Sequence, residues 1–245
     1  MVRRVRSEML KNSVEILVRL SDGDASTADR RLRVCQYLCT NSWYVDLMTE
    51  IGIENTDGIS YRFLNEFNPA LPILRNKIDN TYRVKAGFGQ HPVVGVSHRG
   101  AMLAARAVGG RLPLVGEWEF FATGAFHGRM FPWGNFEPAP FLANFAECYG
   151  GTTAVGKFPP TESGLFDLAG NVEEWCELDG CSLGDLAGCG MTELGMKPVK
   201  GGAWNKGGSL LVCTKTRMKY ERIRTVGTGF RVVWDEACAG IVDDE

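Results

Sequence analysis

The sequence has little net charge, little histidine and no long apolar run, and each shortage excludes a class of protein. Its 27 basic and 29 acidic residues leave a formal net charge of -2. A chain so nearly neutral lacks the positive field that attracts nucleic acid. No segment approaches the roughly 20 apolar residues of a membrane span. We therefore expect neither nucleic acid nor a membrane as a partner.

The first 20 residues also lack the features of a secretory signal. Charges occur throughout them, and no continuous apolar core separates these charges. We therefore predict a cytoplasmic protein, in which the eight cysteines stay reduced. Two groups of cysteines lie close together in the sequence, Cys176, Cys181 and Cys189 in one and Cys35 and Cys39 in the other. Neither group has the paired two-residue spacing of a structural zinc site.

What is present is a composition suited to one loop-rich domain. The chain has 245 residues, is 44% hydrophobic, and spreads 30 glycines and 10 prolines along its length. Such a chain can bury a sizeable core and still form many turns. We predict a single α+β domain over residues 1–245, with its core at about residues 28–235 and with short strands and two to three helices.

Apolar spacing predicts where the helices lie. Residues 41–51, 97–108 and 117–122 have helical periodicity, and Asn41 or Ser42 can cap the first of these segments. Residues 8–20 fit a helix and a strand about equally well. Residues 52–90 are rich in turn formers and predict an irregular surface insertion.

Several ordered motifs carry a family resemblance. Residues 164–175 read GLFDLAGNVEEW, residues 200–204 read KGGAW and residues 229–231 read GFR. Before them come HPVVGVS at 91–97 and GRLP at 110–113. In this order the motifs resemble the formylglycine-generating enzyme family, also called the sulfatase-modifying factor family. The resemblance implies a C-type lectin-like fold of that type.

The resemblance also implies structural calcium, for which oxygen ligands are suitable. The first set of matching positions combines side chains with backbone carbonyls and consists of Asn144, Phe145, Glu147 and Tyr149. The second set is similar and consists of Asp167, Gly170, Val172 and Glu174. In the alternative interpretation these residues only cap turns through hydrogen bonds.

Copper and iron are not expected. The family's oxidases bind copper(I) through two thiolates that follow the Gly-Gly turn, and the matching positions here hold Lys206 and Leu211. Cys213 lies nearby, but one thiol cannot rebuild a two-thiolate site. The related sulfoxide synthases use three histidines, largely in an additional domain. This chain has only His91, His98 and His127.

The segment between the KGGAW and GFR motifs predicts a binding surface. In the family's non-catalytic members, including the variable proteins of diversity-generating retroelements, this segment presents the ligand-binding face. Basic, aromatic and flexible side chains suit such a role. The candidate residues are Trp204, Lys206, Leu210, Leu211, Cys213, Lys215, Arg217, Tyr220, Arg222 and Arg224. An ordinary solvated strand pair is nearly as good an interpretation.

These features predict a non-catalytic protein that binds a protein or small-molecule ligand. A variable protein of a diversity-generating retroelement is one form of this prediction. Adenine-directed variation of asparagine codons cannot produce Lys or Met, so several positions of the segment would be fixed. The alternative is a metal-dependent, oxygen-using oxidase of the same family with a non-standard site.

Overall fold

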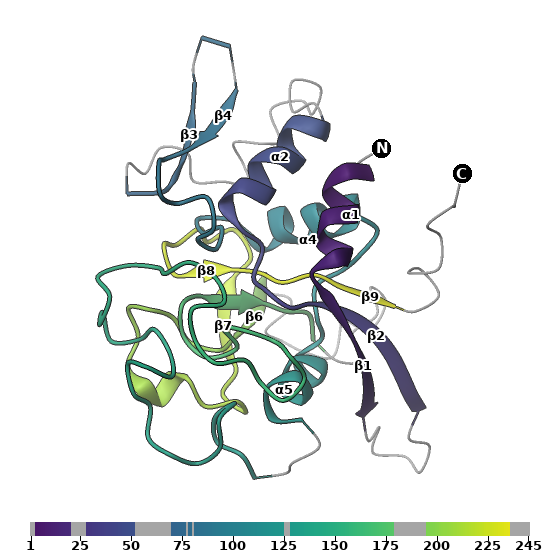
Figure 1. Cartoon of the computed structure of the whole chain (residues 1–245), viewed down its shortest axis with the longest axis vertical. Coiled ribbons are helices and arrows are strands. Elements are labelled where there is room, and N and C mark those ends of the chain that lie inside the picture. Colours follow the sequence, from purple (N-terminus) through teal and green to yellow (C-terminus); the bar gives the residue numbers. More distant parts are fainter. Residues whose placement is uncertain are drawn as a thin grey trace.

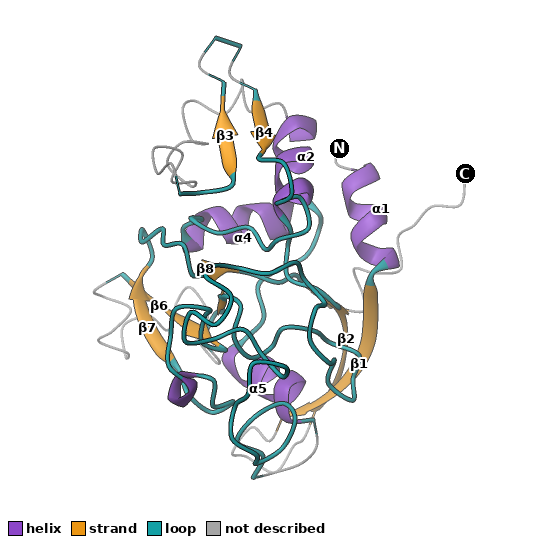
Figure 2. Ribbon diagram, turned by 60° about the vertical axis from the view of Figure 1, so that its left-hand side comes forward, coloured by secondary structure: helices purple, strands orange, loops and turns teal. Residues whose placement is uncertain are grey.

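The computed structural model describes residues 3–20, 28–51, 70–76, 78–79, 81–124, 128–178 and 195–235. In chain order the elements are α1 (Arg3–Lys11), β1 (Ser13–Leu20), β2 (Ala28–Cys35), α2 (Asn41–Ile51), β3 (Ile73–Arg75), β4 (Tyr82–Val84), α4 (His98–Ala107), α5 (Val115–Thr123), β5 (Glu173–Trp175), β6 (Met196–Lys200), η3 (Gly208–Leu210), β7 (Arg217–Tyr220), β8 (Thr228–Gly229) and β9 (Val233–Asp235). Figure 1 shows these elements, and Figure 2 shows that α1, α2 and α4 gather at one end, whereas α5 lies among loops.

The first sheet has the order β1-β2-β9 and is antiparallel throughout. In β1, Ile16 and Val18 are buried while Glu15 and Leu17 are exposed, as the two-residue period of a strand requires. The ambiguous segment 8–20 therefore divides into the end of α1 and the whole of β1.

The second sheet has the order β7-β6-β5-β8, in which only the β5–β8 pair is parallel. Its inner strand β5 is the EEW of the longest sequence motif, and all three residues of this strand are buried. The motif's Gly-Asn pair adopts the left-handed conformation, with φ of 78° at Gly170 and 59° at Asn171. The Asn171 side chain then bonds the backbone of Thr153 at 3.0 and 3.2 Å.

The three predicted helices are confirmed as α2, α4 and α5 within two residues at each end. The cap of α2 differs from the prediction, because Thr40 Oγ1 accepts the N–H of Trp43 at 3.2 Å. Thr40 precedes the helix by one residue, which is where a capping hydroxyl reaches the free amides of the first turn.

The predicted irregular insertion 52–90 is wrong in part. Residues 52–69 lie outside the described residues, but β3 and β4 form an antiparallel hairpin. Its turn is held by Asn76 Nδ2, which donates to Asp79 Oδ2 at 2.8 Å. Short polar side chains of this kind close turns that have no apolar pattern to reveal them.

Among the helices that the structure describes, none has the length and the apolar character of a membrane span.

The GFR motif joins the two sheets. Arg231 is fully buried and bonds both carboxylate oxygens of Glu174, at 3.0 and 2.9 Å. Its guanidinium also donates to the backbone carbonyls of Cys35, Gln36 and Phe166 at 2.7–2.9 Å. One side chain thus connects the end of β2, the loop before β5 and β5 itself.

We expect Glu174→Gln to lower the free energy of unfolding by roughly 3–5 kcal/mol, because it leaves a buried guanidinium without its counter-charge. The matched control is Glu15→Gln, which removes an exposed partner of Arg33 and should change stability by less than about 1 kcal/mol. Urea denaturation measures both variants. Equal losses in the two variants would contradict a special role for the buried pair.

Candidate ligand-binding surface

The segment that follows β6 is fixed by a glycine turn and a tryptophan. Gly201 and Gly202 have φ of 88° and 69°. A Cβ at Gly202 would lie 2.8 Å from the carbonyl oxygen of Leu210, so only glycine fits there. Trp204 Nε1 donates to the carbonyl of Val226 at 3.0 Å and closes the segment into a frame.

A second loop, residues 131–149, lies against this frame. The Ala146 N–H donates to the carbonyl of Lys206 at 2.8 Å. The next residue, Glu147, donates in the same way to Trp204 at 2.6 Å. In Figure 1 both segments lie on the side of the molecule away from β1.

This second loop exposes aromatic side chains, of which Phe136 and Phe141 are not among the residues predicted from the sequence. Phe136 is 79% exposed and Phe141 is 74% exposed, although phenylalanine is normally buried. Tyr149 is 41% exposed and lies 3.8 Å beneath the ammonium of Lys157. Alternation of aromatic residues with Pro, Gly and Asn in residues 131–141 was the available signal.

The ten predicted ligand-binding residues divide by burial. Three are exposed: Lys215, Tyr220 and Arg222. Five are partly buried: Trp204, Lys206, Leu210, Arg217 and Arg224. The remaining two, Leu211 and Cys213, are fully buried.

Leu211 and Cys213 are core residues, contrary to their predicted place on the surface. Leu211 packs with Phe131, Ala143 and Ala169, and so anchors the two loops to each other. Cys213 belongs to a separate apolar cluster, and burial raises the pKa of its thiol to about 12. Neither side chain reaches a ligand at the surface.

Arg217 also forms an internal contact. It forms an ion pair with Glu173, a buried carboxylate of β5 that Lys219 contacts as well. Lys219 Nζ donates further to Thr228 Oγ1 at 2.6 Å. Burial lowers the pKa of Lys219, and Glu173 opposes that shift. These basic groups therefore hold β7 to β5 and β8.

The positions that match the copper ligands cannot form a thiolate site. Lys206 is partly buried and carries an ammonium, and Leu211 lies in the core. Burial keeps the nearby thiol of Cys213 protonated, whereas soft metals bind thiolates. Within the described part of the chain, no three His, Cys, Asp or Glu side chains lie together as a metal-binding group.

The described histidines occupy separate places. His91 Nδ1 lies 3.0 Å from Thr152 Oγ1. His98 Nε2 lies 3.2 Å from the carbonyl oxygen of Cys176 and 3.3 Å from Glu177 Oε1. The remaining histidine, His127, lies outside the described residues.

The second set of calcium positions has one open oxygen. Asp167 Oδ2 accepts the N–H of Gly156 at 2.7 Å, whereas Oδ1 is buried and has no hydrogen-bond partner among the described residues. Burial raises the pKa of Asp167 to about 6. Glu174, by contrast, is already neutralised by Arg231. Asp167 therefore has an oxygen available for a cation, whereas Glu174 would have to share its carboxylate between the cation and Arg231.

The first set lies beside the second. Asn144 and Gly170 form a parallel bridge, and the N–H of Asn171 donates to the carbonyl of Asn144 at 2.8 Å. Asn144 Oδ1 is buried without a partner among the described residues, although its Nδ2 donates to Gly151. Phe145 is partly buried, and the remaining members Glu147 and Tyr149 are exposed. Each set thus offers one buried, unpaired oxygen, as a cation site would.

Residues 27–236 match the family model of the sulfatase-modifying factor enzyme 1-like domain. The chain belongs to this family. The solved structures that are similar over 91% of the chain include the following two. Treponema denticola variable protein 1 has a TM-score of 0.60 at 17% identity and is covered over 93% of its length. CarF has a TM-score of 0.61 at 18% identity and is covered over 95%. The fold is thus the C-type lectin-like fold of the formylglycine-generating enzyme type.

Other similar proteins align over shorter stretches. The chain is 43% identical over 94 residues to the serine/threonine-protein kinase pkn1 of Chlamydia pneumoniae, covering 38% of the chain and 15% of the kinase. It is 36% identical over 98 residues to the formylglycine-generating enzyme of Mus musculus, covering 35% and 26%. Over 97 residues it is 39% identical to the inactive C-alpha-formylglycine-generating enzyme 2 of Bos taurus, covering 35% and 32%. The match therefore spans a third or less of each relative.

Calcium stays a prediction for this member of the sulfatase-modifying factor family, and thermal unfolding tests it. We expect a chelator to lower the melting temperature by at least about 2–4 °C, the change that corresponds to about 1 kcal/mol in a chain of this size. Asp167→Ala should remove the chelator effect, because it deletes the open oxygen.

The matched control for Asp167→Ala is Glu162→Ala, which removes an exposed carboxylate paired with Arg129. This control should keep the parent's response to the chelator. A melting temperature of the parent that does not respond to the chelator would contradict calcium binding.

Proposed function

We propose that this protein is a non-catalytic ligand-binding member of the sulfatase-modifying factor family. The observation that carries the proposal is the pair of side chains at the positions matching the copper ligands. Lys206 brings a positive charge, and Leu211 is buried between the two loops. A thiolate site would need both positions to be cysteine and to face a common metal.

The ligand-binding face consists of the exposed side chains of residues 204–224 and of the neighbouring loop 136–149. Its exposed residues include aromatic and basic side chains, among them Phe136, Phe141, Tyr220 and Arg222, beside two carboxylates, Glu137 and Glu147. Aromatic residues and arginine are enriched where proteins bind one another, because they bury a large area and also form polar contacts. The composition of the face therefore favours a protein ligand.

A rigid base supports this face. Glu173 holds Arg217 and Lys219 beneath it, and Lys200 Nζ donates to Glu119 at 2.6 Å. Buried charges that are paired in this way resist displacement, because separating them leaves an unpaired ion in a poorly solvated place. Exposed side chains above such a base can change without loss of the fold. We further propose that the segment corresponds to the variable segment of retroelement variable proteins, which a reverse transcriptase gene beside this gene would support.

The binding test uses substitutions that leave the base intact. In the triple variant, serine replaces Lys215, Tyr220 and Arg222. We expect this variant to keep the parent's melting temperature, because substitutions of exposed residues usually lower the free energy of unfolding by less than about 0.5 kcal/mol. Arg217 is left unchanged because Glu173 needs it. The variant should lose the proteins that the immobilised parent retains from a host extract, as measured by quantitative mass spectrometry.

Two further variants make this comparison specific. Phe136→Ser with Phe141→Ser removes the aromatic part of the face and should have the same effect. The control replaces Lys11, Glu15 and Leu17, which are exposed on α1 and β1 at the other side of the molecule. If all variants retain the same proteins as the parent, the face is not the binding site.

The competing function is a metal-dependent oxidase, which the identity to formylglycine-generating enzymes keeps open. We expect no conversion of a sulfatase-type cysteine peptide to formylglycine in the presence of copper and oxygen, because the ammonium of Lys206 opposes metal binding there. Peptide mass spectrometry measures conversion, and a formylglycine-generating enzyme serves as the positive control. Conversion above a metal-free reaction, or stoichiometric copper or iron in the purified protein, would favour the oxidase.

A further inference from the structure

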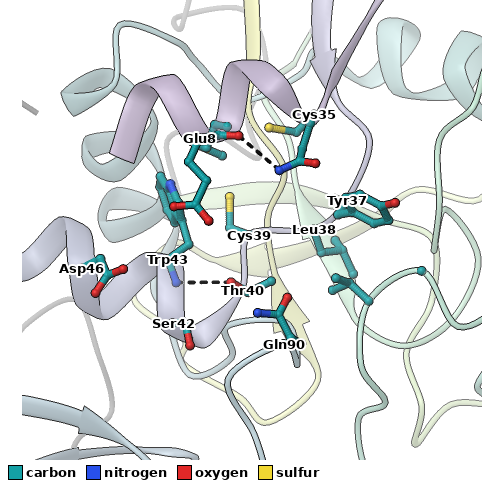
Figure 3. A pocket seen from close by; sticks show the side chains of 14 residues that line it. Glu8, Cys35, Tyr37, Leu38, Cys39, Thr40, Ser42, Trp43, Asp46 and Gln90 are labelled. Carbon is teal, nitrogen blue, oxygen red and sulfur yellow. Dashed lines mark hydrogen bonds between the residues drawn. The ribbon is translucent and has the colours of Figure 1, made fainter. Parts of the chain in front are cut away.

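A cavity of about 400 Å³ lies between α1, the start of α2 and the segment that follows β2. Figure 3 shows Tyr37 and Leu38 on one side of it and Trp43 on the other, with Glu8 reaching in from α1. Its volume lies within the range of small-molecule pockets. None of its lining residues belongs to the proposed ligand-binding face, so the two sites are independent.

One wall of the cavity lies outside the part of the chain that the family model matches. Glu8, Met9 and Asn12 line it, and they precede the matched region 27–236. The N-terminal helix thus closes a space beside the family domain. The position of α1 is fixed, because Val5 and Met9 of this helix are buried in the main apolar cluster.

The charge of the cavity is negative. The described residues that line it include two carboxylates, Glu8 and Asp46, and no Lys, Arg or His. Asp46 lies 3.4 Å from Arg4, in a pair whose side chains are 44% and 75% exposed. No described residue forms an ion pair with Glu8. Lys157 follows a lining residue in the chain, but its ammonium lies over the ring of Tyr149.

The walls are aromatic and fixed in place. Tyr37 stacks on Phe166 with ring centroids 4.9 Å apart, and Trp43 meets Phe230 edge-on at 6.1 Å. The indole N–H of Trp43 is buried and has no partner among the described residues. A ligand would therefore meet preformed aromatic surfaces, which favour organic cations in particular.

The two thiols in the cavity add no charge. Burial raises the pKa of Cys35 to about 12 and raises that of Cys39 well above its usual value. Both groups are consequently neutral at physiological pH and behave as small apolar surfaces. Figure 3 shows the Cys39 sulfur between Glu8 and Leu38, which extends the apolar wall beneath the carboxylate.

We propose that this cavity binds a small organic cation, namely a primary amine with an aliphatic or aromatic body. The ammonium group lies at Glu8, and the body packs against Trp43, Leu38 and the Cys39 sulfur. A carboxylate supplies the counter-charge for the ammonium, and the aromatic walls attract the cation and bury its apolar part. A neutral or anionic analogue lacks the first of these interactions.

Isothermal titration at low ionic strength tests this inference with the full chain. The probes are butylammonium and phenylethylammonium, with phenylethanol as the neutral analogue of the second. We expect at least one amine to bind, with phenylethanol weaker by about two- to fivefold, as expected for the loss of an exposed ion pair. Added salt should weaken binding of the amine, because it screens the carboxylate.

Substitutions of the acidic residues identify where the amine binds. Glu8→Gln should weaken amine binding by about two- to fivefold, whereas Asp46→Asn should weaken it less, because Arg4 already neutralises part of that charge. The control Glu15→Gln removes an exposed carboxylate outside the cavity and should leave affinity unchanged. Equal binding of phenylethanol, unchanged affinity in Glu8→Gln at an unchanged melting temperature, or no binding of either amine would overturn the inference.

Discussion

The buried pair of Arg231 and Glu174 is the contact on which the architecture depends. Arg231 is 0% exposed and satisfies its guanidinium with one carboxylate and three backbone carbonyls. A buried guanidinium is tolerated only when its donors are paired in this way. Because the partners come from the end of β2, the loop before β5 and β5 itself, pairing this one charge fixes the relation between the two sheets.

The same principle extends outward through further ion pairs. Arg111 bonds Glu117 at 2.7 and 2.8 Å and Asp235 at 2.9 and 3.0 Å, which connects α5 to the end of β9. In the second sheet, Lys200 of β6 pairs with Glu119, and Glu173 of β5 pairs with Arg217 and Lys219. A domain with short strands and long loops has few backbone ladders to order it. These side-chain pairs supply the missing order and leave the exposed loop residues free to vary.

The GFR motif supports the proposed cavity and the second sheet through two neighbouring residues. Phe230 packs against Trp43 in the cavity wall, whereas Gly229 pairs with Glu174 in the second sheet. A Cβ at Gly229 would lie 2.5 Å from the carbonyl oxygen of Val93, so the strand passes too close to its neighbour for any side chain. The motif is therefore structural.

The sequence by itself determined the family, the fold and three helices, because these follow from local signals. Glycines at forced turns, an ordered series of motifs and helical apolar spacing are all readable along the chain. Only the tertiary structure decided which side chains of the candidate surface are available. Leu211 and Arg217 belong to the same segment as the exposed Tyr220, yet one lies in the core and the other pairs with a carboxylate 44 residues away. Burial and pairing of this kind depend on contacts between distant segments. For the same reason, only the structure revealed the exposed aromatic loop, the Arg231 partner of Glu174 and the acidic cavity under α1.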